Sequence, residues 1–330
     1  MQQSTLKKIA EALGISVATV SRALSDHYAI SAETKKKVRQ MASTMEYEPN
    51  IAAQQLRTKK SNVIGILLPS INNFFYDSFI AAVEEESRKG DYSVLIMQSH
   101  DLADEEQLAL KHFRQSRISG LFVAITVETE DLSSFDKLKQ ADIPVVFFDR
   151  VPVTAGQVKI CLADEVAARM AAEAIVRKGK KNVLALFGHP HLSISQKREA
   201  SFSQTLAAVP LIQTTIEWPE NIENSYSVFL DAWDQNQGAY DVVFCMGDMI
   251  LVGVMRAIHE LNLKIPDDIA VISISNGFIP TLYKPVITYV ETSGFKLGKL
   301  AFAQMMKLLR HQMVEPEIFV ESALVNGGSL

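Results

Sequence analysis

The chain has 330 residues, of which 48% are hydrophobic and 22% are charged, as expected for a soluble globular protein with more than one domain. No apolar run approaches the ~20 residues that a membrane span needs, and the N-terminus lacks the apolar stretch of a secretory signal. The two cysteines, Cys161 and Cys245, lie far apart in apolar segments, so we expect buried free thiols. These features exclude an integral membrane protein and predict a chain that works in a reducing cytoplasm.

Charge is distributed unevenly along the chain. Residues 1–60 contain ten lysines and arginines against five acidic residues, a balance of +5, whereas the whole chain carries −5. The remaining 270 residues therefore carry −10. A cationic end on an anionic body favours a polyanionic partner at that end only.

The N-terminal segment predicts three short helices around a small core. Thr5 is expected to cap the first helix, which Gly14 ends because glycine adopts the left-handed conformation without a clash. Ser16 is expected to cap a second helix, and Ser31 a third over roughly 32–45. Two helices joined by a short glycine-containing turn form a helix-turn-helix motif. The expected core residues are Leu6, Ile9, Ala10, Leu13, Val20, Ala23, Leu24, Val38, Met41 and Met45.

The outward face of the second helix carries side chains suited to reading DNA in the major groove. Arg22 can donate two hydrogen bonds to guanine, worth ~1–3 kcal/mol of discrimination. Small apolar groups there can contact thymine methyls, and hydroxyls can reach phosphates. The alternative is a generic three-helix cap in which Val17 only shields Val20. The residues expected to contact bases or phosphates are Ser16, Val17, Ala18, Thr19, Ser21 and Arg22.

The segment after the third helix predicts a short helix that needs a partner. Pro49 blocks continuation of the third helix, and Asn50 can cap a new helix of about two turns. A helix this short is marginal in water unless something packs on it, so it should fold only against a second copy and DNA. Leu56 would then act as an apolar wedge at a minor-groove step. The alternative is an ordinary linker.

On these residues the chain resembles the lactose-repressor/galactose-repressor family of bacterial transcription factors. The resemblance rests on Val17-Ala18-Thr19-Val20-Ser21-Arg22, on Ser31, on Tyr47-x-Pro49-Asn50, and on Ala53-Gln54-Gln55-Leu56. It implies that Val17, Ala18 and Arg22 read bases and that Leu56 intercalates. It also implies that residues 50–57 form a hinge helix that orders on operator DNA. The implied backbone or hinge contacts are Thr5, Ser16, Ser21, Asn50 and Ala53.

Beyond residue 61 the pattern changes to alternating apolar strands and amphipathic helices, which predicts two doubly wound parallel sheets with a ligand cleft between the lobes. The expected helices cover about 76–89, 103–116, 132–140, 165–178, 195–208, 222–236, 248–262 and 292–311. The expected strands cover about 62–69, 92–97, 119–124, 144–148, 183–187, 212–217, 241–245 and 269–274.

The family resemblance implies an α/β core like that of periplasmic binding proteins, in which the chain passes between the lobes three times. We place these passages near 160–163, 290–293 and 320–324. The expected division is 1–48 for the helix-turn-helix domain, 49–61 for the hinge helix and linker, and 62–330 for the effector-binding core. Within the core, lobe 1 should cover about 62–161 and 292–322, and lobe 2 about 162–291 and 323–330.

The resemblance also selects residues that would face the cleft, and these residues, with Trp218 added for its aromatic surface, suit a sugar or a similar polyol. Aspartates can each accept two hydroxyl hydrogen bonds, Arg198 can donate a fork, and Phe75 and Trp218 can stack on a ring. The alternatives are helix-cap positions for Asp164 and Asp248 and an interface position for Trp218. The candidate effector-binding residues are Phe75, Asp149, Asp164, Arg198, Trp218, Asp248 and Asn276.

Three positions depart from the family pattern. Gly247 stands where the family commonly has asparagine, Ser275 where it often has aspartate, and Ser201 where it often has glycine. Losing an amide and a carboxylate weakens the case for a specific hexose. An acidic sugar or an atypical polar metabolite therefore stays open as the effector.

An enzyme and a sugar-binding transport receptor are the rival interpretations. No Gly-x-Gly-x-x-Gly follows a strand, residues 294–300 only imitate a phosphate loop, and His189 and His191 lack the spacing of a metal pair. We therefore expect no catalytic residue, metal or cofactor. A transport receptor would need export and no DNA-binding end.

The sequence thus predicts a cytoplasmic transcription regulator that is expected to act as a repressor. Its expected partners are double-stranded operator DNA and a small polar effector. We expect a homodimer, because a near-palindromic operator demands two-fold symmetry and no heptad repeat follows Leu324 to make a tetramer. Whether the effector releases or tightens DNA binding is not predicted.

Overall fold

A computed structural model describes residues 6–47 and 61–330. The chain forms two compact units, Met1–Ser61 and Asn62–Leu330, which are considered one at a time. None of the helices in the described ranges is both long and apolar enough to cross a lipid bilayer.

The first unit contains the three expected helices, α1 (Leu6–Leu13), α2 (Val17–Leu24) and α3 (Ala32–Thr44). The caps predicted at Ser16 and Ser31 are confirmed: their hydroxyls accept hydrogen bonds from Thr19 N at 3.1 Å and Thr34 N at 3.2 Å. Gly14 has the predicted left-handed conformation, with φ of 65°. Thr5, the expected cap of α1, lies outside the described residues. The buried core consists of Ile9, Ala10, Val20, Ala23, Val38 and Ala42.

Lobe 1 of the second unit is a six-stranded parallel sheet with the order β11-β5-β4-β3-β1-β2. Its strands are β1 (Val63–Leu68), β2 (Ser93–Gln98), β3 (Gly120–Val123), β4 (Val145–Phe148), β5 (Val158–Leu162) and β11 (Glu317–Val320). Its helices are α5 (Phe74–Lys89), α6 (Ala103–Gln115), α7 (Ser133–Lys139) and α12 (Gly294–Leu309).

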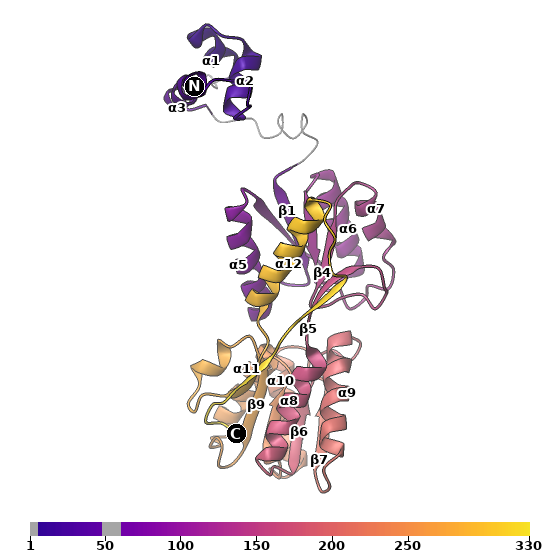
Figure 1. Ribbon diagram of the computed structural model, residues 1–330. Coiled ribbons are helices and arrows are strands. Elements are labelled where there is room, and N and C mark those ends of the chain that lie inside the picture. Colours follow the sequence, from indigo (N-terminus) through magenta and orange to yellow (C-terminus); the bar gives the residue numbers. More distant parts are fainter. Residues whose placement is uncertain (1–5, 48–60) are drawn as a thin grey trace. The chain divides into compact units, whose positions relative to one another are not determined.

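Helices cover both faces of this sheet, as a continuous apolar strand requires (Figure 1). Ile64 and Ile66 of β1 face the cluster that contains Phe79 of α5, whereas Leu67 faces the opposite cluster with Phe113 of α6. Because successive side chains of a strand point to opposite faces, one short apolar run fills two cores.

Lobe 2 is a second six-stranded sheet with the order β12-β10-β9-β8-β6-β7. All its neighbouring strands are parallel except β12, which pairs antiparallel with β10 at the edge. Its strands are β6 (Asn182–Leu186), β7 (Gln213–Glu217), β8 (Val242–Cys245), β9 (Ala270–Ser275), β10 (Thr288–Glu291) and β12 (Ala323–Val325). Its helices are α8 (Asp164–Arg177), α9 (Ser193–Ala207), α10 (Ile222–Gln235), α11 (Asp248–Glu260) and the 3₁₀ helix η1 (Ile279–Leu282).

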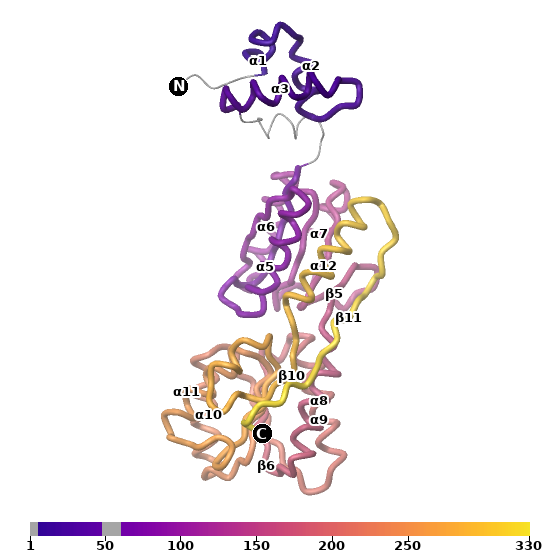
Figure 2. The backbone as a smooth tube through the Cα atoms, turned by 60° about the vertical axis from the view of Figure 1, so that its left-hand side comes forward, coloured from indigo at the N-terminus to yellow at the C-terminus, as the bar shows by residue number. Residues whose placement is uncertain are grey.

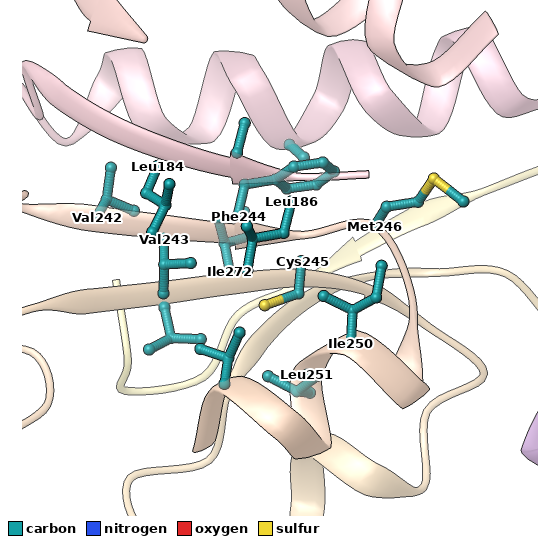
Figure 3. Packing of buried hydrophobic residues seen from close by; sticks show 14 of the residues in the cluster. Leu184, Leu186, Val242, Val243, Phe244, Cys245, Met246, Ile250, Leu251 and Ile272 are labelled. Carbon is teal, nitrogen blue, oxygen red and sulfur yellow. The ribbon is translucent and has the colours of Figure 1, made fainter. Parts of the chain in front are cut away.

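The core of lobe 2 is made by side chains of β6 and β8 that interleave with those of α11. In Figure 3 the side chain of Cys245 on β8 points toward Ile250 and Leu251 of α11. Both cysteines are buried free thiols, as predicted, and burial raises their pKa. Neither thiol is therefore activated as a nucleophile.

The chain passes between the lobes at residue 163, at 292–293 and at 321–322. Figure 2 shows the C-terminal segment running from β11 in lobe 1 into lobe 2 beside β10. Strands β5, β10, β11 and β12 border these passages and were absent from the predicted series. Their apolar runs are short, so pairing with distant strands, rather than local pattern, makes them strands.

Candidate functional site

The exposed face of α2 runs from Val17, next to the Ser16 cap, to Arg22 in the last turn of the helix. Val17 is 44% exposed, and Ala18 and Arg22 are also exposed. In the described part of the chain the Arg22 side chain makes no hydrogen bond or ion pair, so its guanidinium is free to bind a ligand. The Ser16 hydroxyl accepts a hydrogen bond from the Thr19 backbone amide. It is also hydrogen-bonded to the Thr19 hydroxyl, at 2.8 Å.

The loop after α2 adds an aromatic residue that the sequence analysis did not single out. Tyr28 is 92% exposed, and its ring stacks on His27 with 4.4 Å between centroids. Behind it, Lys35 and Arg39 both contact the Asp26 carboxylate, and the hydrogen bond from Lys35 is the main cause that lowers the pKa of Asp26. The candidate hinge residues Asn50, Ala53 and Leu56, like Thr5, lie outside the described residues.

A cavity of about 490 Å³ lies between the two lobes of the second unit. It opens at the carboxyl ends of the strands, where ligands bind to doubly wound sheets. Asp149 follows β4, Gly188 follows β6, Met246 to Asp248 follow β8, and Ser275 and Asn276 end β9. A volume of this size suits a small molecule.

Arg198 of α9 is buried at the wall of this cavity and is held by two partners from its own lobe. Its Nε and Nη2 both lie 2.8 Å from Oδ1 of Asp164, and Nη1 donates to the Met246 carbonyl at 2.9 Å. Burial raises the pKa of Asp164 to about 6, and the Arg198 charge opposes that rise. Three of the five N–H groups are used, so two stay available to a ligand.

Asp149 of lobe 1 faces the same cavity and is almost fully buried. It accepts a hydrogen bond from the Tyr76 hydroxyl at 2.9 Å. Its φ of 56° is uncommon for a residue other than glycine and turns the side chain at the end of β4. Burial raises the pKa of the Asp149 carboxyl, while the charges of Arg150 and Arg198 act to lower it.

Asp248, the first residue of α11, holds the loop that follows β9. Its Oδ1 accepts from the Ser275 hydroxyl at 2.5 Å, and its Oδ2 accepts from the Asn276 amide at 3.0 Å. Burial raises the pKa of Asp248, and both hydrogen bonds act to lower it. The residue therefore carries an acceptor into the cavity and also fixes a neighbouring loop.

Two pairs of polar side chains that line the cavity were missed by sequence reasoning. Arg150 donates to Asp101 at 2.6 Å in lobe 1, and His189 lies 3.6 Å from Glu220 in lobe 2. All four residues line the cavity. Tyr76 was missed as well, because an aromatic residue on a helix face predicts core packing and gives no local sign of its hydrogen bond.

Not every candidate effector residue lies on the cavity wall. Phe75, Asp149, Arg198, Asp248 and Asn276 line the cavity, but Asp164 and Trp218 do not. Trp218 packs on the core of lobe 2, with its ring 5.6 Å from that of Phe187. Its expected stacking on a ligand ring is therefore not supported by this position. The amide of Asn276 is engaged by lobe 1.

Two family models match the chain. Residues 5–50 match the bacterial regulatory proteins of the lacI family, and residues 64–313 match the periplasmic binding protein domain. The chain belongs to the lacI family of bacterial regulatory proteins. It is accordingly a DNA-binding transcriptional regulator and not an enzyme.

Named relatives of this lacI-family chain match it over nearly its whole length. The HTH-type transcriptional repressor PurR of Vibrio vulnificus is 24% identical over 322 residues, which cover 96% of this chain and 95% of the relative. The ribose operon repressor of Lactococcus lactis is 26% identical over 317 residues, covering 94% and 93%. The crystal structure of the lac repressor dimer bound to operator and the anti-inducer ONPF has the same fold, with a TM-score of 0.88, 23% identity and 99% of each chain covered.

The departures from the family pattern have defined places in the lacI-family fold. The family often has a carboxylate at position 275. Here the Ser275 hydroxyl donates to the Asp248 carboxylate, so a hydrogen bond stands where a second carboxylate would place two negative charges close together. A side chain at Gly247 would meet no atom within 4 Å, so the absent amide leaves space in the cavity wall. Ser201 donates to the Glu165 carbonyl at 2.7 Å and ties α9 to α8.

Proposed function

We propose that this lacI-family regulator is a cytoplasmic repressor that binds operator DNA as a homodimer under the control of a polyhydroxylated small molecule. The observation that carries the proposal is the Arg22 guanidinium on the exposed face of α2, which makes no hydrogen bond or ion pair with any residue in 6–47 or 61–330. A free guanidinium in the last turn of α2, on its exposed face, is suited to two hydrogen bonds with guanine in the major groove.

Base reading is assigned to Val17, Ala18 and Arg22, whose side chains share the exposed face. Phosphate and backbone contacts are assigned to the hydroxyls of α2 and of its cap residue, which are those of Ser16, Thr19 and Ser21. Thr5, Asn50 and Ala53 complete the backbone contacts and Leu56 the minor-groove wedge, as the family resemblance implies. The cationic balance of residues 1–60 supports association with a polyanion.

The effector is assigned to the cleft, and its chemistry follows from the groups that stay available there. Asp149 offers a buried acceptor and Asp248 a half-buried one, Arg198 offers two N–H donors, and Phe75 offers an aromatic surface. Alternating hydroxyls of a sugar or sugar-like polyol satisfy such a mixture of donors and acceptors. Asp164 is assigned to the support of Arg198 and Asn276 to the contact between lobes.

Control of DNA binding follows from differential affinity. A ligand that bridges Asp149 of lobe 1 and Arg198 of lobe 2 stabilises one arrangement of the lobes over another. In a two-fold symmetric dimer this change alters the spacing of two DNA-reading helices, and with it the affinity for two half-sites.

The test is selection of binding sites by the full-length chain from a random double-stranded DNA library. The expected result is a near-palindrome of two half-sites whose binding weakens steeply with added salt. A thermal-shift screen of neutral sugars, sugar acids and nucleobases then identifies the effector, since a tight ligand raises the melting temperature. Selection that enriches no sequence would contradict the proposal.

A further inference from the structure

The amide of Asn276 crosses from lobe 2 to lobe 1. Its Oδ1 accepts from the Gly294 backbone amide at 2.9 Å and lies 3.1 Å from the Ser78 hydroxyl, whose hydrogen is shared with the Phe75 carbonyl at 3.0 Å. Its Nδ2 lies 3.3 Å from the Phe74 carbonyl, to which it donates. One side chain at the end of β9 is thus bonded to the first turns of two lobe 1 helices, α5 and α12.

These two helices form a closely packed pair that receives the amide. A side-chain carbon at Gly294 would lie 2.4 Å from the Phe75 carbonyl oxygen, and one at Gly298 would lie 2.8 Å from Cβ of Ala82. The N-termini of α5 and α12 therefore meet without intervening side chains. Figures 1 and 2 both show the two helices running side by side in lobe 1.

The hydrogen bond to Gly294 satisfies a group that the helix cannot satisfy itself. The first amides of a helix have no acceptor within the helix. Ser293, the cap residue, accepts from Lys296 N at 3.2 Å, which leaves the Gly294 amide to Asn276. Lobe 2 thus supplies a cap for a helix of lobe 1, and separation of the lobes would expose a buried donor.

The loop that carries Asn276 is also held by Asp248, a residue that lines the cleft. Asp248 accepts from the Ser275 hydroxyl and from the Asn276 amide, so both of its oxygens hold the loop. The Ser275 hydroxyl in turn accepts from the Gly277 amide at 2.9 Å, and Gly277 has a φ of 102°. The direction of the Asn276 side chain is thereby set by a carboxylate that faces the cavity.

We propose that Asn276 is a positioning residue that latches lobe 2 to the paired N-termini of α5 and α12, and that Asp248 couples this latch to the cleft. A ligand hydroxyl bound to Asp248 competes with Ser275 and Asn276 for the same two oxygens. Binding of a ligand in the cleft would in this way alter the contact that the Asn276 side chain makes with lobe 1. The coupling to ligand rests on the proposed function, whereas the latch does not.

The first test measures the Gly294 amide in the full-length chain without DNA or ligand. Asn276→Ala should accelerate hydrogen exchange at Gly294 by roughly 2- to 10-fold, the equivalent of one hydrogen bond. Exchange at Ala301, in the middle of α12, should stay unchanged. Asn326→Ala is the matched control, because Asn326 is exposed in lobe 2 and has no side-chain hydrogen bond among the described residues. Equal exchange at Gly294 in parent and Asn276→Ala overturns the latch.

The second test measures the distance between lobes with spin labels at Lys139→Cys in α7 and Gln235→Cys in α10. Both positions are exposed, and the two native cysteines are buried. Asn276→Ala should add a population of molecules with a different interlobe distance. Ser78→Ala removes only one of the three contacts, so the added population should be smaller. If Asn276→Ala does not fold, Ser78→Ala carries the test. A distribution that is unchanged in the variant that folds overturns the latch.

Coupling to the cleft is tested by Asp248→Ala, alone and combined with Asn276→Ala. Both changes should act through one loop, so the double variant should change the distances no more than Asn276→Ala alone. An unchanged distribution in Asp248→Ala overturns the coupling. Because no operator or effector is present, a negative result here is distinct from failure of the proposed function.

Discussion

Nε and Nη2 of Arg198 are both directed at a single oxygen of Asp164, at 2.8 Å each. The pair is buried, with side-chain exposures of 7% and 5%. Asp164 thereby orients the guanidinium toward the cavity and leaves its remaining N–H groups for a ligand. Asp164, which the sequence analysis placed among the candidate effector residues, thus contacts Arg198 and does not itself line the cavity.

Breaking this pair from one side should be strongly destabilising. Arg198→Met leaves the Asp164 carboxylate buried without its cation, which should lower the free energy of unfolding by about 3–5 kcal/mol. The double change Arg198→Met with Asp164→Leu should cost clearly less than Arg198→Met alone, since no charge is left unpaired. Urea unfolding followed by circular dichroism measures both, and a loss below about 1 kcal/mol for Arg198→Met would refute the assignment.

The ionisation of Asp164 should give stability a defined pH dependence. Its pKa is about 6 in the folded chain against an ordinary 3.8, so the folded state holds this proton to a higher pH than the unfolded chain does. Ionisation of Asp164 should therefore remove stability as the pH rises from about 4 to about 6, with no further loss above that. Urea melts at pH 4, 5, 6 and 7 should show this component in the parent and not in Asp164→Asn. Parallel pH profiles for the two proteins would argue against a raised pKa.

Arg22→Ala should weaken binding to the selected operator by about 1–3 kcal/mol, roughly 5- to 150-fold, because one bidentate base contact is lost. Binding to unrelated DNA should change little. Lys36→Ala is the matched control, because it also removes one exposed positive charge from the N-terminal unit, but from α3 and not from α2. Fluorescence anisotropy at fixed salt measures both affinities. Equal losses on operator and unrelated DNA would show that Arg22 contacts only the backbone.

Gly253→Ala should destabilise lobe 2 although alanine favours helices. Its Cβ would lie 2.3 Å from the Ile222 carbonyl oxygen, and a backbone group cannot yield as a flexible side chain does. We expect a net loss of about 1–3 kcal/mol, larger than the ~1 kcal/mol gained in helix propensity. Gly247→Ala is the control, because no atom lies within 4 Å of its added carbon and its φ of −168° is extended backbone. Thermal unfolding that ranks the two variants the other way would contradict the packing of α10 on α11.

Much of the fold was predictable because its signals are local. A serine that caps a helix acts on an amide three residues away, so Ser16 and Ser31 mark the starts of α2 and α3 wherever the rest of the chain lies. Gly14 ends a helix for an equally local reason. Alternation of apolar strands with amphipathic helices extends the same logic to the class of the core, since it requires sheets covered on both faces.

The site was predictable only in part, because its chemistry arises where distant segments meet. Asp149 and Arg198 were predicted at the cleft and line it, since strand ends of a parallel sheet gather at one edge. Nothing near Trp218 in the sequence indicates that it packs on Phe187, and nothing near Asn276 indicates bonds to residues about 200 positions earlier. Those partners are chosen by how the two lobes pack, because a side chain bonds whatever group the fold brings within reach.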